Sequence, residues 1–496
     1  MRNLENLSFD NRFARLADNY HSRVTPSPLG QPYLVSFNPD AAALLDLDPA
    51  AAQRREFLEY FSGNRLLPGA EPVATVYAGH QFGVYVPQLG DGRAMLLGEV
   101  RNAQGASWDV QLKGAGKTPY SRFADGRAVL RSSIREYLCG EAMHALGIPS
   151  TRALCIVGSD DPVERETVET AAVLTRLAPT HIRFGHFEYF YYRQQFDRLA
   201  PLADYVIGEH FPQLAQQPAA TRYRNWLAEV IARTAQLIAR WQAVGFCHGV
   251  MNSDNMSIVG VTLDYGPYGF MDAFDFGHIC NHSDEGGRYA YNQQPAIAHW
   301  NLSCLVQACL PLLAEPPEAA VEIGTALLKD FPAQFEAEFL TLLRAKFGLL
   351  GAQDEDPALM EGFLSLLHAN HADFTRSFRA LAALDVAADA PCAVLRDEFT
   401  DRAALDAWAS DYRARLRQQG GDDAIRATEM RRVNPKYVLR NYLVQAAIEQ
   451  AQHKNYAEIE TLRKLLACPY DEQPELERYA QHPPEWAGGI SVSCSS

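Results

Sequence analysis

Apolar and polar positions alternate most regularly between residues 94 and 176. Within 108–113 the alternation is strict, which is the period-two pattern of a half-buried strand. The run 94–100 is almost wholly apolar and predicts a buried strand, and the Asn-Ala-Gln-Gly sequence at 102–105 predicts the turn that joins the two. Strands are also expected at 152–158 and 170–176. This part of the chain should therefore form a small sheet.

Helical periodicity dominates most of the remaining chain. A helix is expected at about 132–146, with Ile134, Leu138 and Ala142 on one stripe and a stop at Gly147. The fold class predicted from these patterns is α+β, with a small strand-rich part followed by a large helical part. The other expected helices are an Ala/Leu-rich one around 40–60 and those at 222–245, 301–313, 317–348, 358–369, 400–417 and 435–452.

Composition narrows the classes of function. The 496 residues are 47% hydrophobic and 21% charged, as in globular proteins, and the net charge of −15 argues against a nucleic-acid partner. A local cluster of Lys and Arg would still bind a nucleotide. The N-terminus resembles no targeting signal and no run predicts a membrane span, so a cytoplasmic protein is expected. Nine cysteines without a C-x-x-C pair indicate neither a zinc site nor a disulfide framework.

The segment 248–266 carries the strongest chemical signal. It matches the protein-kinase catalytic loop at His248 and Asn255, but Val250 stands where the catalytic Asp belongs. Asp264 opens an Asp-Tyr-Gly sequence that resembles the kinase Asp-Phe-Gly. An Asn oxygen and an Asp carboxylate are hard ligands for Mg²⁺ against nucleotide phosphates, so a metal site is predicted without the usual base. Spacing alone leaves Asp275, which opens a literal Asp-Phe-Gly, as an alternative to Asp264.

The expected sheet adds phosphate-binding candidates in kinase order. A glycine turn at 88–93 precedes Lys113 at the end of a strand, and Glu136 lies on the following helix, where a kinase pairs Glu with Lys. The alternative for Glu136 is a capping box with Ser133. Two arginines of the segment 176–183 would bind phosphates bidentately or, alternatively, pair with surface carboxylates.

Several long blocks together resemble the selenoprotein O (YdiU) family over nearly the whole chain. The resemblance implies a protein-kinase-like two-lobed fold, divided as an N-terminal extension (1–70), an N-lobe (71–180), a C-lobe with the metal site (181–345) and a helical C-terminal region with a redox-active tail (346–496). The matching blocks are His80–Gly83, Gln111–Arg122, Arg176–Arg183, His248–Asn255, Asp264–Asp272, Asn434–Tyr437 and Cys494–Ser496.

The resemblance also implies an activity and its residues. The family binds ATP inverted and transfers AMP to Ser, Thr or Tyr (or His) side chains of proteins, and UMP transfer from UTP with Mn²⁺ is also attributed to it. On this sequence Asp254 matches the proton acceptor, and Asn255 and Asp264 match the ligands of Mg²⁺ or Mn²⁺. Glu136 matches the partner of Lys113. The nucleotide-binding positions matched are Gly90, Gly92, Arg93, Lys113, Asp125, Gly126, Arg176, Arg183 and Asp264.

Other interpretations remain open at this point. Asp254 is either the general base or a carboxylate that supports a metal ion. The protein is alternatively a small-molecule phosphotransferase of kinase-like fold, or a nucleotide-binding pseudokinase scaffold with Cys280 and Cys494 as a redox switch. Against the switch stands the simpler interpretation that Cys494 is an ordinary exposed thiol and Cys280 a buried one.

Overall fold

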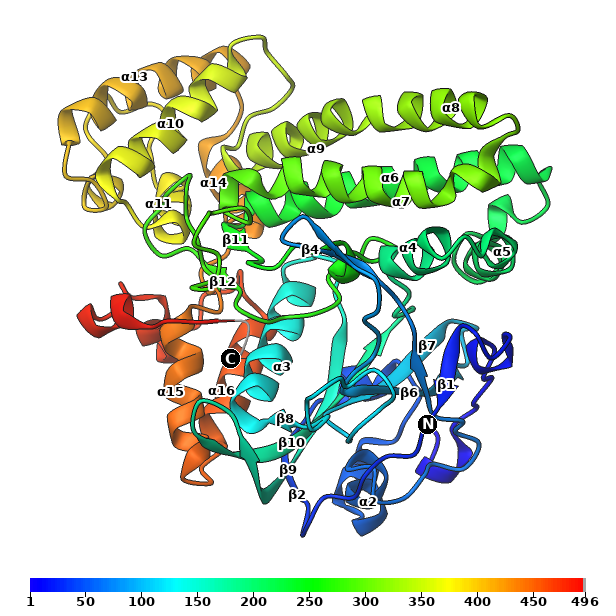
Figure 1. The fold of residues 1–496 in the computed structure, drawn as a ribbon. Helices are drawn as coiled ribbons and strands as arrows, with labels where there is room; N and C mark the ends of the chain where they lie inside the picture. Colours follow the sequence, from blue (N-terminus) through cyan, green and yellow to red (C-terminus); the bar gives the residue numbers. More distant parts are fainter. Residues whose placement is uncertain (494–496) are drawn as a thin grey trace.

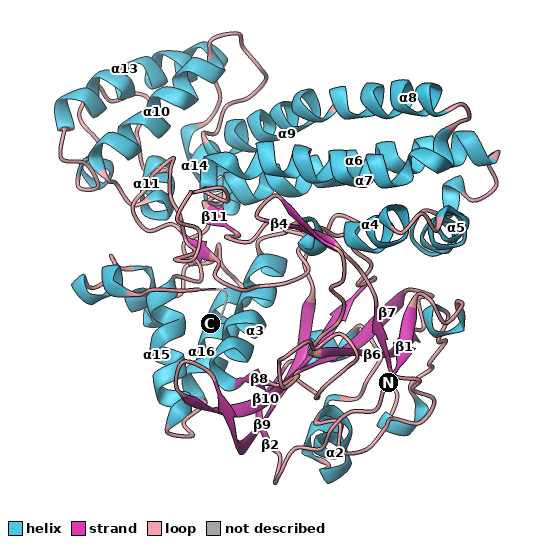
Figure 2. Cartoon of the chain, in the orientation of Figure 1, coloured by secondary structure: helices cyan, strands magenta, loops and turns pink. Residues whose placement is uncertain are grey.

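The computed structural model describes residues 1–493 and shows one antiparallel sheet of eight strands beside a large helical part (Figures 1 and 2). The mixed fold class predicted from the sequence is confirmed. In order across the sheet, the strands are β1 (His21–Arg23), β3 (Val73–Thr75), β6 (Ala94–Arg101), β7 (Ser107–Lys113), β10 (Val168–Ala178), β9 (Arg152–Glu164) and β2 (Tyr33–Phe37), and β8 (Ala128–Val129) pairs with β10.

The four longest strands are those that the sequence pattern predicted. β6 and β7 form the expected hairpin, and β9 and β10 form the second one, each extending beyond its predicted range. By contrast, the sequence did not predict β1 and β2, which lie in the first 70 residues and still complete the sheet. They are three and five residues long, too short for a period-two pattern to emerge.

Helices make up most of the remaining structure (Figure 2). Their bounds are α1 (Pro39–Ala43), α2 (Arg55–Phe61), α3 (Leu130–Ala145), α4 (Phe184–Tyr192), α5 (Leu199–His210), α6 (Ala219–Ala243), α7 (Gln294–Leu313), α8 (Pro317–Lys329), α9 (Phe331–Lys346), α10 (Asp356–Asn370), α11 (Phe374–Leu381), α12 (Ala393–Arg396), α13 (Arg402–Gln419), α14 (Asp423–Val433), α15 (Asn441–Gln452) and α16 (Ala457–Ala467).

Two of the predicted helices are wrong as single elements. The helix expected around 40–60 is broken into α1, a 3₁₀ turn and α2, because Asp46 adopts a positive φ of 56° and Pro49 starts a new turn capped by Asp48. The helix expected at 317–348 is divided at Asp330 into α8 and α9, and Pro332 lies in the first turn of α9.

The last helices of the chain pack against the strand-rich part. α15 and α16 return from the helical part and lie beside α3, which itself covers β9 and β10 (Figure 1). α3 is therefore buried between the sheet and this returning pair, which fixes the residues that it carries.

One helical stretch, Tyr291–Leu313, is long and apolar enough to cross a membrane, with a mean hydropathy of 1.4. It contains α7, which packs against α4, α6 and α8 in the helical part. Its buried side chains face these neighbouring helices, as in the core helix of a globular domain.

Two short hairpins lie outside the main sheet. β11 (Phe246–Cys247) pairs with β12 (Gly269–Phe270), and β4 (Gly79–Gln81) pairs with β5 (Val84–Val86). The β4–β5 hairpin leaves the strand-rich part and reaches the helical part near α4 (Figure 1). Both hairpins therefore lie where the two parts of the molecule meet.

Candidate active site

The pairing of β11 with β12 closes the segment 248–268 into a loop. Nε2 of His248 donates to the carbonyl oxygen of Asp264 at 3.0 Å, which ties the two motifs of this segment together. The imidazole stacks on Trp241 with ring centroids 5.1 Å apart, and burial lowers the pKa of His248 to about 4. A neutral His248 is therefore part of the scaffold of the loop.

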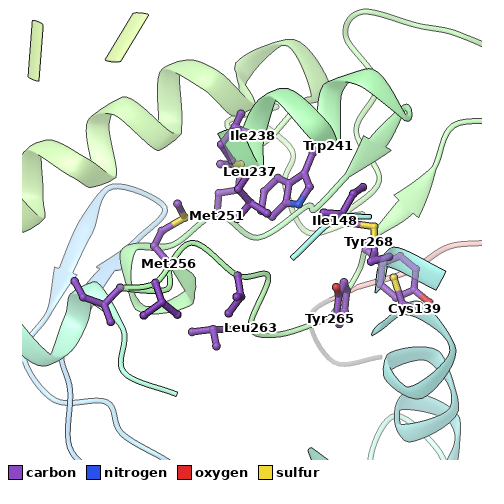
Figure 3. Packing of buried hydrophobic residues seen from close by; sticks show 14 of the residues in the cluster. Cys139, Ile148, Leu237, Ile238, Trp241, Met251, Met256, Leu263, Tyr265 and Tyr268 are labelled. Carbon is purple, nitrogen blue, oxygen red and sulfur yellow. The ribbon is translucent and has the colours of Figure 1, made fainter. Parts of the chain in front are cut away.

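Apolar side chains anchor this loop on α6. Met251, Met256 and Leu263 point from the loop into the core, and the α6 residues Leu237, Ile238 and Trp241 lie on the other side of the same cluster (Figure 3). All of these side chains are almost fully buried. The polar residues that alternate with them along the loop are consequently held at the surface of a rigid core.

Three charged side chains from three neighbouring elements converge next to Asp264 of this loop. Nζ of Lys113, at the end of β7, lies 2.5 Å from Glu136 of α3 and 2.6 Å from Asp264. Nη1 of Arg176, on β10, lies 2.9 Å from Glu136 and 3.2 Å from Asp264. Two cations thus share two carboxylates in a closed network, and the structure brings together residues that are far apart in the sequence.

Asp264 is the most exposed member of this network, with 29% of its side chain accessible. Burial by itself raises the pKa of this carboxyl group, but Lys113, Arg176 and Arg183 lower the pKa well below the usual value for Asp. Asp264 is therefore ionised, as a metal ligand must be.

The capping-box interpretation of Glu136 is wrong. α3 starts at Leu130 with Val129 as its N-cap, so Ser133 lies inside the helix, where its hydroxyl donates to the carbonyl of Val129. The sequence suggested a cap because the helix was expected to start later. Glu136 is instead a buried partner of Lys113.

Replacing Glu136 with Gln is expected to lower the free energy of unfolding by about 3 kcal/mol, because it leaves two buried cations with only one carboxylate. Denaturant unfolding monitored by circular dichroism measures this. The control is Glu59→Gln, whose partner Arg55 is 89% exposed and whose loss should cost less than about 0.5 kcal/mol. Equal stability of the two variants would contradict a structural role for the network.

Arg183 and Asn255 also line the cleft. Nη1 of Arg183 donates to the carbonyl of Asp254 at 2.9 Å, and its guanidinium lies 5.0 Å from the ring centroid of Tyr77. Nδ2 of Asn255 donates to the carbonyl of Val250 at 3.1 Å, which orients the amide. The Asn255 oxygen then faces the cleft, 3.5 Å from Nη1 of Arg183.

Asp254 is buried, with a total exposure of 6%, and is tightly surrounded. Its Oδ2 accepts from Nε2 of Gln81 at 3.3 Å, whereas Oδ1 has no hydrogen-bond partner within residues 1–493. A Cβ atom added to Gly79 would lie 2.8 Å from Cβ of Asp254, so only glycine fits there. Burial raises the pKa of Asp254 to about 7. An unpartnered carboxylate oxygen with this pKa is suited to accept a proton.

The predicted glycine turn lies against the loop 118–126. A Cβ atom added to Gly92 would lie 2.9 Å from the carbonyl oxygen of Tyr120, and one added to Gly126 would lie 2.2 Å from Gly116. Gly126 also has a positive φ of 73°. These glycines therefore permit a close backbone approach that forms one wall of the cleft.

Asp125 has an arginine partner that the sequence did not indicate. Its two oxygens accept from Nη1 and Nη2 of Arg165 at 2.9 and 3.1 Å. Arg165 lies between β9 and β10, forty positions along the chain, so only the fold brings the two together. Asp125 is consequently held in place by Arg165.

All of these groups line one cleft with a volume of about 670 Å³ between the strand-rich and helical parts. Glu136 is the one predicted nucleotide-site residue that does not line it, because it lies beneath Lys113. Further lining cations that the sequence analysis missed are Arg122, Arg127 and Arg165. The predicted residues in the lining are Gly90, Gly92, Arg93, Lys113, Asp125, Gly126, Arg176, Arg183, Asp254, Asn255 and Asp264.

The alternative Asp275 lies elsewhere. Its Oδ1 is 3.4 Å from Nδ1 of His368 and also accepts from the backbone N–H of Gly277. It does not line the cleft. The geometry therefore favours Asp264 over the literal Asp-Phe-Gly sequence.

The oxygen atoms of Asn255 and Asp264 fit a hard divalent cation. Within residues 1–493 no cluster of three His, Cys, Asp or Glu side chains forms a complete metal site. Mg²⁺, however, is commonly held by one or two protein oxygens and completed by nucleotide phosphates and water. An ionised carboxylate and an oriented amide oxygen on the wall of one cleft match this requirement.

The structure describes only one of the two cysteines of the predicted redox switch. Cys280 is buried, and its thiol donates to the carbonyl of Pro267 at 2.9 Å. Cys494 lies outside the described residues, so the pairing of the two cysteines stays a prediction. The chain just before it is anchored nearby, because the backbone N–H of His282 donates to the carbonyl of Val492 at 2.8 Å.

A cleft lined by carboxylate and amide oxygens and by several Lys and Arg side chains suits a nucleotide-dependent transferase, and comparison with known proteins specifies the family. The family described as "Protein adenylyltransferase SelO" matches residues 3–467. The chain is 57% identical to protein nucleotidyltransferase YdiU of Thiobacillus denitrificans and 58% identical to that of Thioalkalivibrio sulfidiphilus, over 100% of each chain. It is 54% identical to that of Myxococcus xanthus, again over 100% of both chains. The chain therefore belongs to the SelO family of nucleotidyltransferase enzymes.

Proposed function

We propose that this protein transfers AMP from ATP to Ser, Thr or Tyr side chains of other proteins, with Mg²⁺ or Mn²⁺ as cofactor. Transfer of UMP from UTP, with His as a further acceptor, is the variant of the same chemistry. The observation that supports the proposal is the convergence of Asn255, Asp264 and several phosphate-binding cations around Asp254. Val250 lines the same cleft in place of the kinase base, which favours a different proton acceptor.

We propose further that the strand-rich and helical parts are the two lobes of a protein-kinase-like fold, which agrees with this function. The sheet and α3 supply Lys113 and Glu136, as a kinase N-lobe does, and the helical part supplies the loop 248–268. The cleft lies between them. The lobe boundaries at 71–180 and 181–345 stay a prediction, and β1, β2, α15 and α16 pack onto the strand-rich part from outside the first range.

Each step of the proposed transfer is assigned to particular side chains. The acceptor hydroxyl oxygen forms a bond to the α-phosphorus, the bond to the bridging oxygen breaks, and pyrophosphate leaves. The carboxylate of Asp254, which lines the cleft, takes the hydroxyl proton. Lys113 and Arg176 neutralise charge on the phosphoryl oxygens. When held by Asn255 and Asp264, the metal ion would supply further positive charge to the phosphates.

The proposal is tested by finding which labelled phosphate of ATP, α or γ, becomes attached to protein. We expect the purified protein, with Mg²⁺ or Mn²⁺ and a bacterial lysate as acceptor, to retain label from α-labelled ATP and none from γ-labelled ATP. Retention from the γ position would indicate a protein phosphotransferase instead. ADP release with free metabolites as acceptors would indicate the small-molecule enzyme, and ATP binding without turnover would indicate the scaffold.

A further inference from the structure

The β4–β5 hairpin is fastened to the candidate catalytic loop. The backbone N–H of His80 donates to the Ser253 hydroxyl at 2.7 Å. The backbone N–H of Phe82 donates to the Tyr289 hydroxyl at 2.8 Å and to the Asn252 side chain at 3.3 Å. Tyr289 in turn donates to Asn252 at 2.5 Å. The tip of the hairpin is therefore fixed relative to Asp254, although it belongs to the other part of the molecule.

Phe82 lies at this tip in a conformation that a phenylalanine rarely adopts. Its φ is +49°, in the left-handed region that costs a non-glycine residue about 1 kcal/mol or more. Its ring packs on Tyr289 with centroids 5.0 Å apart, and 41% of the residue remains exposed. It lines the same cleft as Asp254. A glycine would adopt this φ without strain. The fold therefore gives no structural reason for an aromatic ring at this position.

Arg288 adds a cation beside the same turn. Its guanidinium lies 4.8 Å from the ring centroid of Trp300, and a Cβ atom added to Gly83 would come within 3.3 Å of it. Its buried Nε has no hydrogen-bond partner, and no carboxylate forms an ion pair with it within residues 1–493. An arginine stacked on an aromatic ring keeps the edge of its guanidinium available for a carboxylate.

We propose that Phe82 and Arg288 form the docking surface for the acceptor segment of the protein substrate. The surface fits an extended segment that places an apolar side chain on the Phe82 ring and an acidic side chain on Arg288. The hydroxyl between them then faces the carboxylate of Asp254, which lines the same cleft. This inference rests on the proposed function and specifies the chemistry of its acceptor.

A synthetic peptide library with a fixed central Ser, Thr or Tyr and α-labelled ATP tests the surface. The wild-type enzyme should select peptides with apolar and acidic residues near the hydroxyl. Phe82→Gly should lose the apolar selection and Arg288→Gln the acidic selection, each with kcat/KM for the best peptide reduced about tenfold. The affinity for non-hydrolysable ATP should stay within twofold, because the proposal places both side chains against the acceptor segment and not against the nucleotide. Glycine accepts the positive φ, so the Phe82 variant should fold.

Matched controls are Phe196→Ala, which removes a phenylalanine of 45% exposure outside the cleft, and Arg224→Gln on the exposed face of α6. Both should retain wild-type selection. If Phe82→Gly and Arg288→Gln transferred normally and selected the same peptides as the wild type, the docking surface would be overturned but the proposed function would not. Loss of ATP affinity in Phe82→Gly would overturn it in favour of a platform for the nucleobase. Absence of any transfer by the wild-type enzyme would overturn the proposed function and the docking surface with it.

Discussion

Asp264→Asn is expected to reduce transfer of α-label roughly a thousandfold or more. The substitution keeps the size of the side chain but removes the charge that the surrounding cations hold ionised. It thereby removes a metal ligand and leaves Lys113 and Arg176 to compete for the single carboxylate of Glu136. Initial rates with saturating ATP, measured against the wild type at several Mg²⁺ and Mn²⁺ concentrations, give the effect.

The chain provides its own control for this substitution. Asp275 opens the literal Asp-Phe-Gly sequence, and 47% of its side chain is exposed beside His368. Asp275→Asn should therefore transfer label at close to the wild-type rate. A near wild-type rate for Asp264→Asn together with a large loss for Asp275→Asn would contradict the assignment of the metal site to Asp264.

Asp254→Asn is expected to lower kcat by about 10²- to 10⁴-fold, the usual range for removing a general base. The amide oxygen still accepts the hydrogen bond from Gln81, so the loop should keep its shape and ATP affinity should change little. Asp254→Glu should not restore activity, because Gly79 leaves no space for a longer side chain. Single-turnover rates together with equilibrium ATP binding separate the two effects.

Near-normal turnover of Asp254→Asn would remove the assignment of Asp254 as proton acceptor. The unpartnered Oδ1 would then serve to orient the acceptor or to support a second cation. Asp264→Asn would remain inactive in that case, so the two substitutions test separate steps of the same mechanism.

Elements with a regular local pattern were predictable from the sequence. β6, β7 and α3 are long enough for apolar positions to recur with the period of a strand or a helix, and each appears close to its predicted range. β1 and β2 are too short for such a pattern, and their place at the edges of the sheet depends on partners far along the chain. The breaks near Asp46 and Asp330 depended on local backbone geometry that periodicity does not report.

The residues of the candidate site also divide into those that the sequence identified and those that only the fold brings together. His248, Asn255 and Asp264 lie in one short segment, so the residue types and their spacing identified the metal-binding chemistry. Arg165 carries no such signal, because its relation to Asp125 exists only after β9 and β10 pair. Spacing alone left both Asp-Phe-Gly-like sequences open, the family resemblance matched Asp264, and the fold adds that Asp264 reaches Lys113.

By itself the sequence determined the secondary structure of the long elements, the chemistry of the catalytic segment and, through its long matching blocks, the family. Tertiary structure alone decided that α3 starts before Ser133, so that Glu136 lies buried between Lys113 and Arg176, and that the β4–β5 hairpin holds Phe82 beside the buried Asp254. The physical reason is that periodicity and motifs record interactions between residues close in the chain. The burial and charge pairing of the site arise instead between segments that meet only when the chain folds.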